Sequence, residues 1–291
     1  MVETNLRIAF WGTSSFSVYV LEALALQGIK PALIITAPPK PKGRGLELSP
    51  SDAKQWADIH HIPTLEPSEI KSEEFLRTLG RDWDLFVIAS YGKIVPRTIL
   101  DLPKHGTLNV HPSLLPKFRG PTPLQSSILE KAPVGEPHEI GVTVMLIDEQ
   151  VDHGPIVATK KITVENWPLK DTELEQTLGM LGGKLLAETI PHWVAGDITP
   201  TEQNHALATY TKKIVKADAL VRLNDDAADT LRKIRAFNIW PRAYFMSHRG
   251  GREIRVVITE AHIENDALKI DRVIPEGKRE MSYTEFLHGQ K

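Results

Sequence analysis

Asn109 and His111 are the residues whose types and spacing best suit chemistry on a small ligand. They follow an apolar run, residues 106–108, that predicts a buried strand. On an extended segment, side chains two positions apart leave the same face, and the strand should end at Pro112, which cannot donate a ladder hydrogen bond. An amide and an imidazole are therefore expected at the carboxyl end of a strand, where open α/β sheets bind ligands. Spacing alone leaves open the alternative of an ordinary strand end with a hydrogen-bonded Asn and a surface His.

Three motifs around these residues resemble those of a known family. Residues 109–116, Asn-Val-His-Pro-Ser-Leu-Leu-Pro, resemble the signature of the folate-dependent formyltransferases. Residues 119–123, Arg-Gly-Pro-Thr-Pro, resemble the methionyl-tRNA formyltransferase branch of that family. Residues 151–155, Val-Asp-His-Gly-Pro, resemble the second family motif, which carries a catalytic Asp. Three motifs in the right order are a specific signal. The resemblance covers most of the chain and is weakest after about residue 245, where this chain is shorter than typical members.

The resemblance implies a catalytic set of Asn109, His111 and Asp152. Formyl transfer from a folate nitrogen to an amine is acyl transfer through a tetrahedral oxyanion, which the site must stabilise while it moves protons. Asn109 is an uncharged donor for the formyl oxygen, and a protonated His111 adds a charge-assisted donor. Asp152 would favour that imidazolium and could accept the proton of the nucleophile through a water molecule.

By the same resemblance, the co-substrate is 10-formyltetrahydrofolate, and Ser113, Leu114, Leu115 and Pro116 form its binding segment. The apolar side chains of this segment suit a pteridine or aryl ring. Tyr91 follows a strongly apolar strand whose end is a wall of the folate pocket in the family; core packing is an equal alternative for its side chain.

A metal site is not expected. The chain contains no Cys, and His138-Glu139 is not followed by the second His of a zinc-protease motif. Nor is there a Gly-x-Ser-x-Gly nucleophile elbow, so a serine hydrolase fits less well.

Residues 38–50 are rich in Pro and Gly, which predicts a loop without regular structure. The loop carries Lys40, Lys42 and Arg44, and in the family it meets the tRNA acceptor end. We therefore expect contact with initiator methionyl-tRNA, because a basic mobile loop suits phosphate binding. A flexible surface loop with solvated charges is the alternative. The chain as a whole has a net charge of −2, but the part from Thr209 onward contains 16 Lys and Arg residues and only 12 Asp and Glu residues. This basic tail also favours a polyanionic partner.

The order of elements predicts an α/β fold. A strand at residues 6–12, a helix from Phe16 to about Gly28 and a strand at residues 31–36 form a βαβ unit, which implies a parallel sheet. Residues 12–15 lack the dinucleotide-binding glycine pattern, so NAD binding is not supported. We expect a Rossmann-like formyltransferase domain with a parallel-rich sheet at residues 1–195.

A linker is expected at residues 196–205 because this stretch is polar and follows a long amphipathic helix that begins at Asp171. A second, tRNA-binding domain should span residues 206–291. Its short strands at regular spacing predict a small barrel, OB-like in the family, which the short tail could leave trimmed.

The whole chain fits a cytoplasmic enzyme. Its 291 residues, with 41% hydrophobic and 25% charged content, suit a globular protein with no membrane partner, and we expect a monomer. The absence of Cys and of a basic amino-terminal region fits the cytoplasm. The expected reaction is formyl transfer from 10-formyltetrahydrofolate to the methionine amine of initiator methionyl-tRNA. The alternatives are a sugar-nucleotide N-formyltransferase and an idle folate- or tRNA-binding module.

Overall fold

The computed structural model describes residues 6–42, 47–249 and 251–289. Arg44 and the amino-terminal residues 1–5 lie outside the described residues. The contacts within the chain divide it into two compact units. Unit 1 comprises Met1–Arg119, Ile140–Ile162 and Glu175–Tyr210, and unit 2 comprises Gly120–Glu139, Thr163–Leu174 and Thr211–Lys291. Each unit consists of three separate segments of the chain. The division of the chain into two domains by one linker at residues 196–205 therefore stays a prediction.

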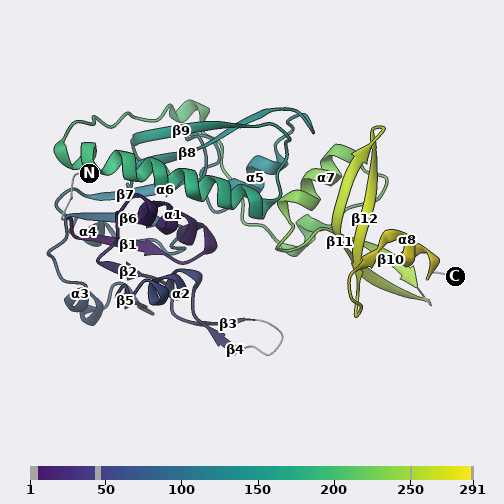
Figure 1. Ribbon diagram of the computed structural model, residues 1–291, viewed down its shortest axis with the longest axis horizontal. Coiled ribbons are helices and arrows are strands. Elements are labelled where there is room, and N and C mark those ends of the chain that lie inside the picture. Colours follow the sequence, from purple (N-terminus) through teal and green to yellow (C-terminus); the bar gives the residue numbers. More distant parts are fainter. Residues whose placement is uncertain (1–5, 43–46, 250, 290–291) are drawn as a thin grey trace. The chain divides into compact units, whose positions relative to one another are not determined.

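Unit 1 is built on a seven-stranded sheet with the order β5-β2-β1-β6-β7-β8-β9 (Figure 1). The pairs from β5 to β7 are parallel and β7 pairs with β8 in the antiparallel sense, so the predicted parallel-rich α/β fold is confirmed. Apolar runs form the central strands because both of their faces are buried. The strands are β1 (Ile8–Gly12), β2 (Leu33–Ile35), β5 (Thr64–Leu65), β6 (Leu85–Ala89), β7 (Thr107–His111), β8 (His138–Leu146) and β9 (Ile156–Val164).

The helix expected from Phe16 to about Gly28 is α1, and the helix expected to begin at Asp171 is α6. The Ser51 side chain accepts a hydrogen bond from the Lys54 backbone, so Ser51 is the N-cap of α2. Pro112 directly follows β7, as expected of a residue without an N–H group. The helices up to residue 195 are α1 (Ser15–Leu26), α2 (Asp52–Ile59), α3 (Glu73–Leu79), α4 (Arg97–Leu100), α5 (Pro123–Leu129) and α6 (Asp171–Ala195).

Glycines on α6 let this helix lie close to both α1 and the sheet. A Cβ atom at Gly183 would lie 2.5 Å from the Val20 carbonyl oxygen of α1, and one at Gly182 would lie 2.6 Å from Cγ1 of Val110 on β7. Both distances are shorter than atomic contact permits, so only glycine fits. Since Val110 stands between Asn109 and His111, this packing fixes the strand that carries them.

The prediction of a loop without regular structure at residues 38–50 is wrong in part. β3 (Lys40–Lys42) and β4 (Glu47–Ser49) form an antiparallel pair with Lys40 opposite Ser49. Pro41 is compatible with this ribbon because each strand has only one neighbour, so an edge without a donor is tolerated.

Unit 2 contains a four-stranded antiparallel sheet with the order β10-β11-β12-β13 (Figure 1), which confirms the predicted small β domain. Leu231 and Ile234 of α7 (Ala227–Ala236) belong to a buried cluster with strand residues such as Val256. Ser282 and Glu285 form a capping box at the start of the last helix. The strands are β10 (Tyr244–Arg249), β11 (Arg252–Glu264), β12 (Ala267–Pro275) and β13 (Met281–Ser282), and the closing helix is α8 (Tyr283–His288).

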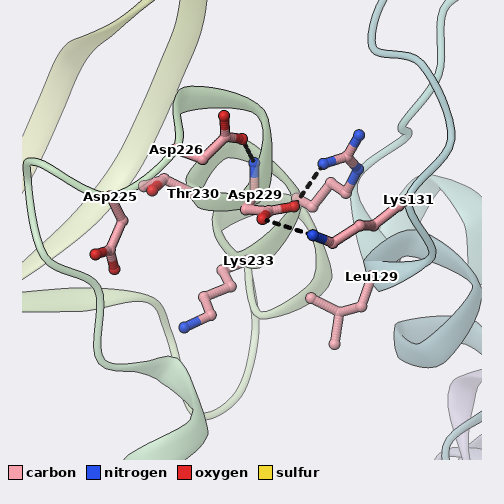
Figure 2. A pocket seen from close by; sticks show the side chains of 8 residues that line it. Leu129, Lys131, Asp225, Asp226, Asp229, Thr230 and Lys233 are labelled. Atoms are coloured by element: carbon pink, nitrogen blue, oxygen red, sulfur yellow. Dashed lines mark hydrogen bonds and ion pairs between the residues drawn. The ribbon is translucent and has the colours of Figure 1, made fainter.

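A cavity of about 430 Å³ lies within unit 2. Its wall is of mixed charge: Lys131 and Asp229 point toward each other (Figure 2) and form an ion pair at 3.5 Å. None of the predicted catalytic or folate-binding residues lines this cavity, so the cavity is not the predicted active site. The lining residues are Leu129, Lys131, Asp225, Asp226, Asp229, Thr230, Arg232 and Lys233.

No helix among residues 6–42, 47–249 and 251–289 has both the length and the apolar composition needed to cross a membrane.

Candidate active site

Asn109 and His111 lie at the carboxyl end of β7, as the sequence predicts. Asn109 is opposite Ile88 on β6 and Met145 on β8, so it sits in the middle of the sheet. Its side chain is half-buried, and among the described residues it makes no hydrogen bond. A half-buried amide without an internal partner has its donors available for a ligand.

His111 and Asp152 are brought together although they are distant in the sequence. Nδ1 of His111 lies 3.5 Å from Oδ1 of Asp152, and the two side chains are 6% and 17% exposed. The other ring nitrogen of His111, Nε2, lies 3.1 Å from the Phe118 carbonyl oxygen. If Nε2 donates to that carbonyl, Nδ1 faces the carboxylate, so Asp152 can stabilise a proton there.

Asp152 lies in a turn whose backbone conformation is unfavourable. Its φ is +50°, in the left-handed region that residues other than glycine seldom adopt. The turn is closed at Gly154, where a Cβ atom would overlap the Leu146 carbonyl oxygen. Such a conformation persists only when surrounding contacts hold it.

Gln203 supplies two such contacts. Its amide nitrogen Nε2 donates to the carbonyl oxygens of Asp152, at 3.0 Å, and Gly154, at 2.7 Å. Its side-chain oxygen accepts two hydrogen bonds from Arg119, from Nη2 at 2.6 Å and from Nε at 3.1 Å. The four hydrogen bonds use both donors and both lone pairs of the buried amide.

Arg119 lies behind Gln203 and is only 1% exposed. Of its other donors, Nη2 lies 2.9 Å from Nδ1 of His205, and Nη1 lies 3.3 Å from the Tyr210 hydroxyl. Among the described residues, no carboxylate pairs with this guanidinium. A buried cation without a carboxylate partner is unusual, because desolvation of the charge is costly.

Two histidines extend this network. His153, directly after Asp152, lies with Nδ1 2.6 Å from Oδ2 of Asp148. Its ring is stacked on that of His205, with a centroid distance of 4.0 Å and an angle of 3° between the planes. The turn of the second motif is therefore contacted by Gln203 through its backbone and by Asp148 and His205 through the His153 ring.

The predicted folate segment, Ser113 to Pro116, is held by internal hydrogen bonds. Ser113 is buried and its hydroxyl donates to the Lys117 carbonyl oxygen at 2.6 Å. The Thr143 hydroxyl donates to the Ser113 carbonyl and accepts from the Leu115 backbone. Leu115 is buried, whereas Leu114 and Pro116 are half-buried. The segment therefore presents apolar rather than polar groups.

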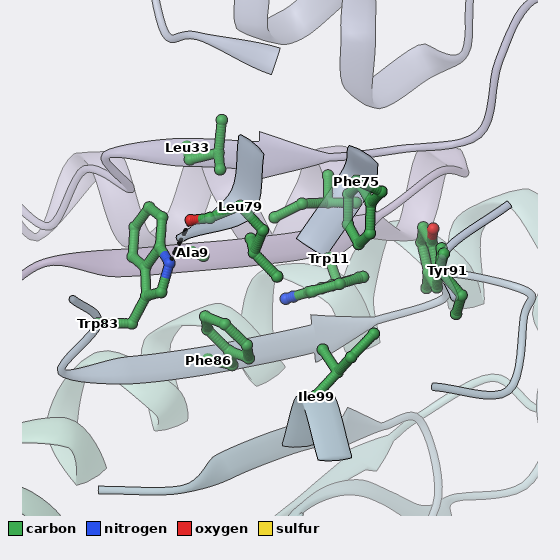
Figure 3. Close-up of a cluster of buried hydrophobic side chains, with 11 residues drawn as sticks. Ala9, Trp11, Leu33, Phe75, Leu79, Trp83, Phe86, Tyr91 and Ile99 are labelled. Carbon is green, nitrogen blue, oxygen red and sulfur yellow. Dashed lines mark hydrogen bonds between the residues drawn. The ribbon is translucent and has the colours of Figure 1, made fainter. Parts of the chain in front are cut away.

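Tyr91 lies in the hydrophobic core of unit 1 and is 3% exposed. Figure 3 shows its ring beside Trp11, with a centroid distance of 5.3 Å in an edge-on arrangement. Its hydroxyl has no hydrogen-bond partner among the described residues, and burial raises the pKa of Tyr91 to about 12. These contacts favour the core alternative for the side chain.

Lys40 has an exposed side chain on β3, and Lys42 ends the same strand. Arg44, the family's functional Arg by resemblance, lies outside the described residues. Within the described ranges, no group of three or more His, Asp or Glu side chains is arranged to hold a metal ion.

No sequence pattern indicates a function for Gln203, which lies in the predicted linker, or for Thr143. Arg119 belongs to one of the three motifs, but its type and position there do not predict its role. Glutamine and threonine are ordinary surface residues, so only their burial and their partners distinguish them.

Comparisons with known proteins identify the family of the chain. Residues 6–190 match the family described as formyl transferase, and residues 213–267 match its C-terminal domain. The methionyl-tRNA formyltransferase of Thermodesulfovibrio yellowstonii is 34% identical over 304 residues, which covers 98% of this chain and 96% of the relative.

Solved structures share the fold at lower identity. The methionyl-tRNA formyltransferase from Clostridium thermocellum has a TM-score of 0.58 at 15% identity, covering 93% of this chain and 98% of that one. The N-formyltransferase from Helicobacter canadensis, solved with folinic acid and dTDP-3-aminofucose, has a TM-score of 0.60 at 19% identity, covering 91% and 95%. The chain belongs to the formyl transferase family, and over nearly its whole length it matches the family's methionyl-tRNA formyltransferases.

Proposed function

We propose that this protein transfers the formyl group of 10-formyltetrahydrofolate to the methionine amine of initiator methionyl-tRNA in the cytoplasm. The observation that carries the proposal is the contact of His111 with Asp152 beside the amide of Asn109, which has no partner among the described residues. The full-length similarity to methionyl-tRNA formyltransferases supports the choice of acceptor.

In the proposed reaction, the methionine nitrogen attacks the formyl carbon, and the formyl oxygen becomes an oxyanion. Asn109 donates a hydrogen bond to this oxygen, and Nε2 of a protonated His111 donates a second, in place of its contact with the Phe118 carbonyl oxygen. Asp152 stabilises the imidazolium and receives the proton that the amine loses, through a water molecule. The bond between the folate nitrogen N10 and the formyl carbon then breaks, and N10 takes up the proton that Asp152 received.

Substrate binding divides between apolar and basic surfaces in this proposal. Leu114 and Pro116, which are half-buried, present an apolar surface for the folate ring, with Ser113 and Leu115 shaping the segment. Lys40, Lys42 and Arg44 and the basic residues after Thr209 face phosphates of the tRNA.

The direct test offers methionyl-tRNA and a dTDP-amino sugar as acceptors, each with 10-formyltetrahydrofolate. We expect formylation of the tRNA alone. Transfer to the sugar with none to the tRNA would overturn the proposal in favour of a sugar-nucleotide N-formyltransferase, and transfer to neither would favour a binding module.

A second test addresses the basic loop. Arg44→Ala and Lys40→Ala should weaken tRNA binding, with folate affinity unchanged. In a plot of the logarithm of the tRNA association constant against the logarithm of the salt concentration, the slope should become shallower by about 0.7–0.9 for each phosphate that the variant no longer neutralises. Lys30→Ala is the matched control, because Lys30 is an exposed lysine of unit 1 outside this loop. Unchanged tRNA affinity in the loop variants would mean that the loop is a solvated surface segment.

A further inference from the structure

The proposed chemistry requires the Asp152 carboxylate to stay beside His111, although the turn that carries Asp152 is conformationally unfavourable. Its φ of +50° lies in the left-handed region, which a residue other than glycine keeps only when surrounding contacts hold it. The His111 Nδ1 atom lies 3.5 Å from the carboxylate, which is long for a hydrogen bond. Contacts to the backbone of the turn therefore also matter for the position of the carboxylate.

Gln203 is the side chain that contacts this backbone at two points. It donates to the carbonyl oxygens on either side of His153, those of Asp152 and Gly154. A primary amide that bridges two carbonyls of one turn fixes the turn's orientation, since neither carbonyl can rotate without losing its donor.

Arg119 determines which way the Gln203 amide faces. It donates two hydrogen bonds to the side-chain oxygen, so the amide nitrogen must point toward the Asp152 turn. If the amide were reversed, its N–H groups would face a buried guanidinium, which has no acceptor. Because a guanidinium stays charged at working pH, this orientation does not change with the protonation state of the site.

We propose that Gln203, oriented by Arg119, is a positioning residue that holds the Asp152 carboxylate against His111 for proton transfer. The proposal rests on the proposed function, because it gives Asp152 a part in formyl transfer. It assigns a part in catalysis to the stretch between residues 196 and 205, which the sequence predicts only as a polar linker.

Two substitutions at Gln203 separate positioning from packing. Gln203→Met keeps the approximate volume but removes all four hydrogen bonds. Gln203→Glu keeps an acceptor for Arg119 and gains an ion pair, but loses both donors to the turn. Since a displacement of about 1 Å at a reacting group can cost about 100-fold, we expect each variant to lower kcat by about 10- to 100-fold, with folate affinity within about twofold. A kcat near the wild-type value in Gln203→Glu would overturn the proposal, because holding Arg119 would then be enough.

A double-mutant cycle with Asp152→Ala gives the decisive readout. If Gln203 acts through Asp152, then Gln203→Met should cost no more than about two- to threefold in single-turnover rate once the carboxylate is gone. Equal losses in both backgrounds would overturn the proposal.

Gln125→Met is the matched control. It also removes a glutamine amide with two hydrogen bonds, which go to the Asp171 carboxylate in unit 2, and it should leave kcat unchanged. If both Gln203 variants misfolded and lost folate binding, Arg119→Lys would replace them in the double-mutant cycle with Asp152→Ala, because it leaves Gln203 itself unchanged. A wild-type protein inactive on methionyl-tRNA would contradict the proposed function, whereas an active wild type with an additive cycle would contradict only the positioning role.

Discussion

Replacement of Asn109 by alanine separates catalysis from stability more cleanly than any other change at the site. The Asn109 side chain makes no hydrogen bond among the described residues, so its removal leaves no buried group unpaired. We therefore expect the free energy of unfolding to change by less than about 1 kcal/mol. Loss of one oxyanion donor should lower kcat by about 10²- to 10³-fold, or about 2.7–4 kcal/mol in the barrier.

His111→Ala makes a useful comparison. His111 is almost fully buried, lies 3.1 Å from the Phe118 carbonyl oxygen and contacts Asp152. Its removal should therefore lower both activity and stability, the latter by about 2–3 kcal/mol, because a cavity and unpaired groups remain.

The assay is single-turnover formyl transfer to methionyl-tRNA, with folate affinity and urea unfolding measured on the same preparations. A kcat of Asn109→Ala within about threefold of the wild-type value would refute the oxyanion role of Asn109. A loss of activity that merely parallels a loss of folded protein would refute the claim that its amide is free for a ligand.

Three further predictions concern the surroundings of the site. Tyr91→Phe removes a buried hydroxyl without a partner among the described residues, so urea unfolding should show equal or higher stability, by up to about 1 kcal/mol, with folate affinity unchanged; a tenfold weaker folate affinity would mean that the hydroxyl binds folate. Burial raises the pKa of Glu175 above its usual 4.5. The protonated Glu175 side chain therefore contributes fully to the stability of the fold below pH 4.5, and this contribution is lost as the pH rises through the raised pKa. Glu175→Gln should therefore gain stability relative to the wild type as pH rises above 4.5, and a difference independent of pH in urea unfolding would contradict this. Gly183→Ala should lower the free energy of unfolding by about 1–3 kcal/mol, because the new methyl group would meet the Val20 carbonyl oxygen; an unchanged or raised value would show that α1 and α6 can move apart.

Short-range signals explain the parts of the fold that the sequence predicts well. The start of α6 at Asp171 agrees with the prediction because an acidic residue suits a helix start and the residues after it continue with helical spacing. The β3–β4 ribbon is not predicted because Pro and Gly composition argues against strands, whereas a two-stranded ribbon needs few ladder donors. The side-chain environment of Tyr91 could not be decided, because an aromatic residue after a buried strand suits a pocket and a core equally.

By itself, the sequence determined the parallel-rich sheet, the end of β7 before Pro112, and the three motifs that suggested formyl transfer. These features depend on residue type and local order, which the chain carries before it folds. Only the tertiary structure decided that His111 meets Asp152, and that Gln203 lies between Arg119 and the Asp152 turn. Gln203 is 84 residues from Arg119 and 51 from Asp152 along the chain. Contacts over such separations follow from the path of the whole chain and the burial it creates, so no local pattern encodes them.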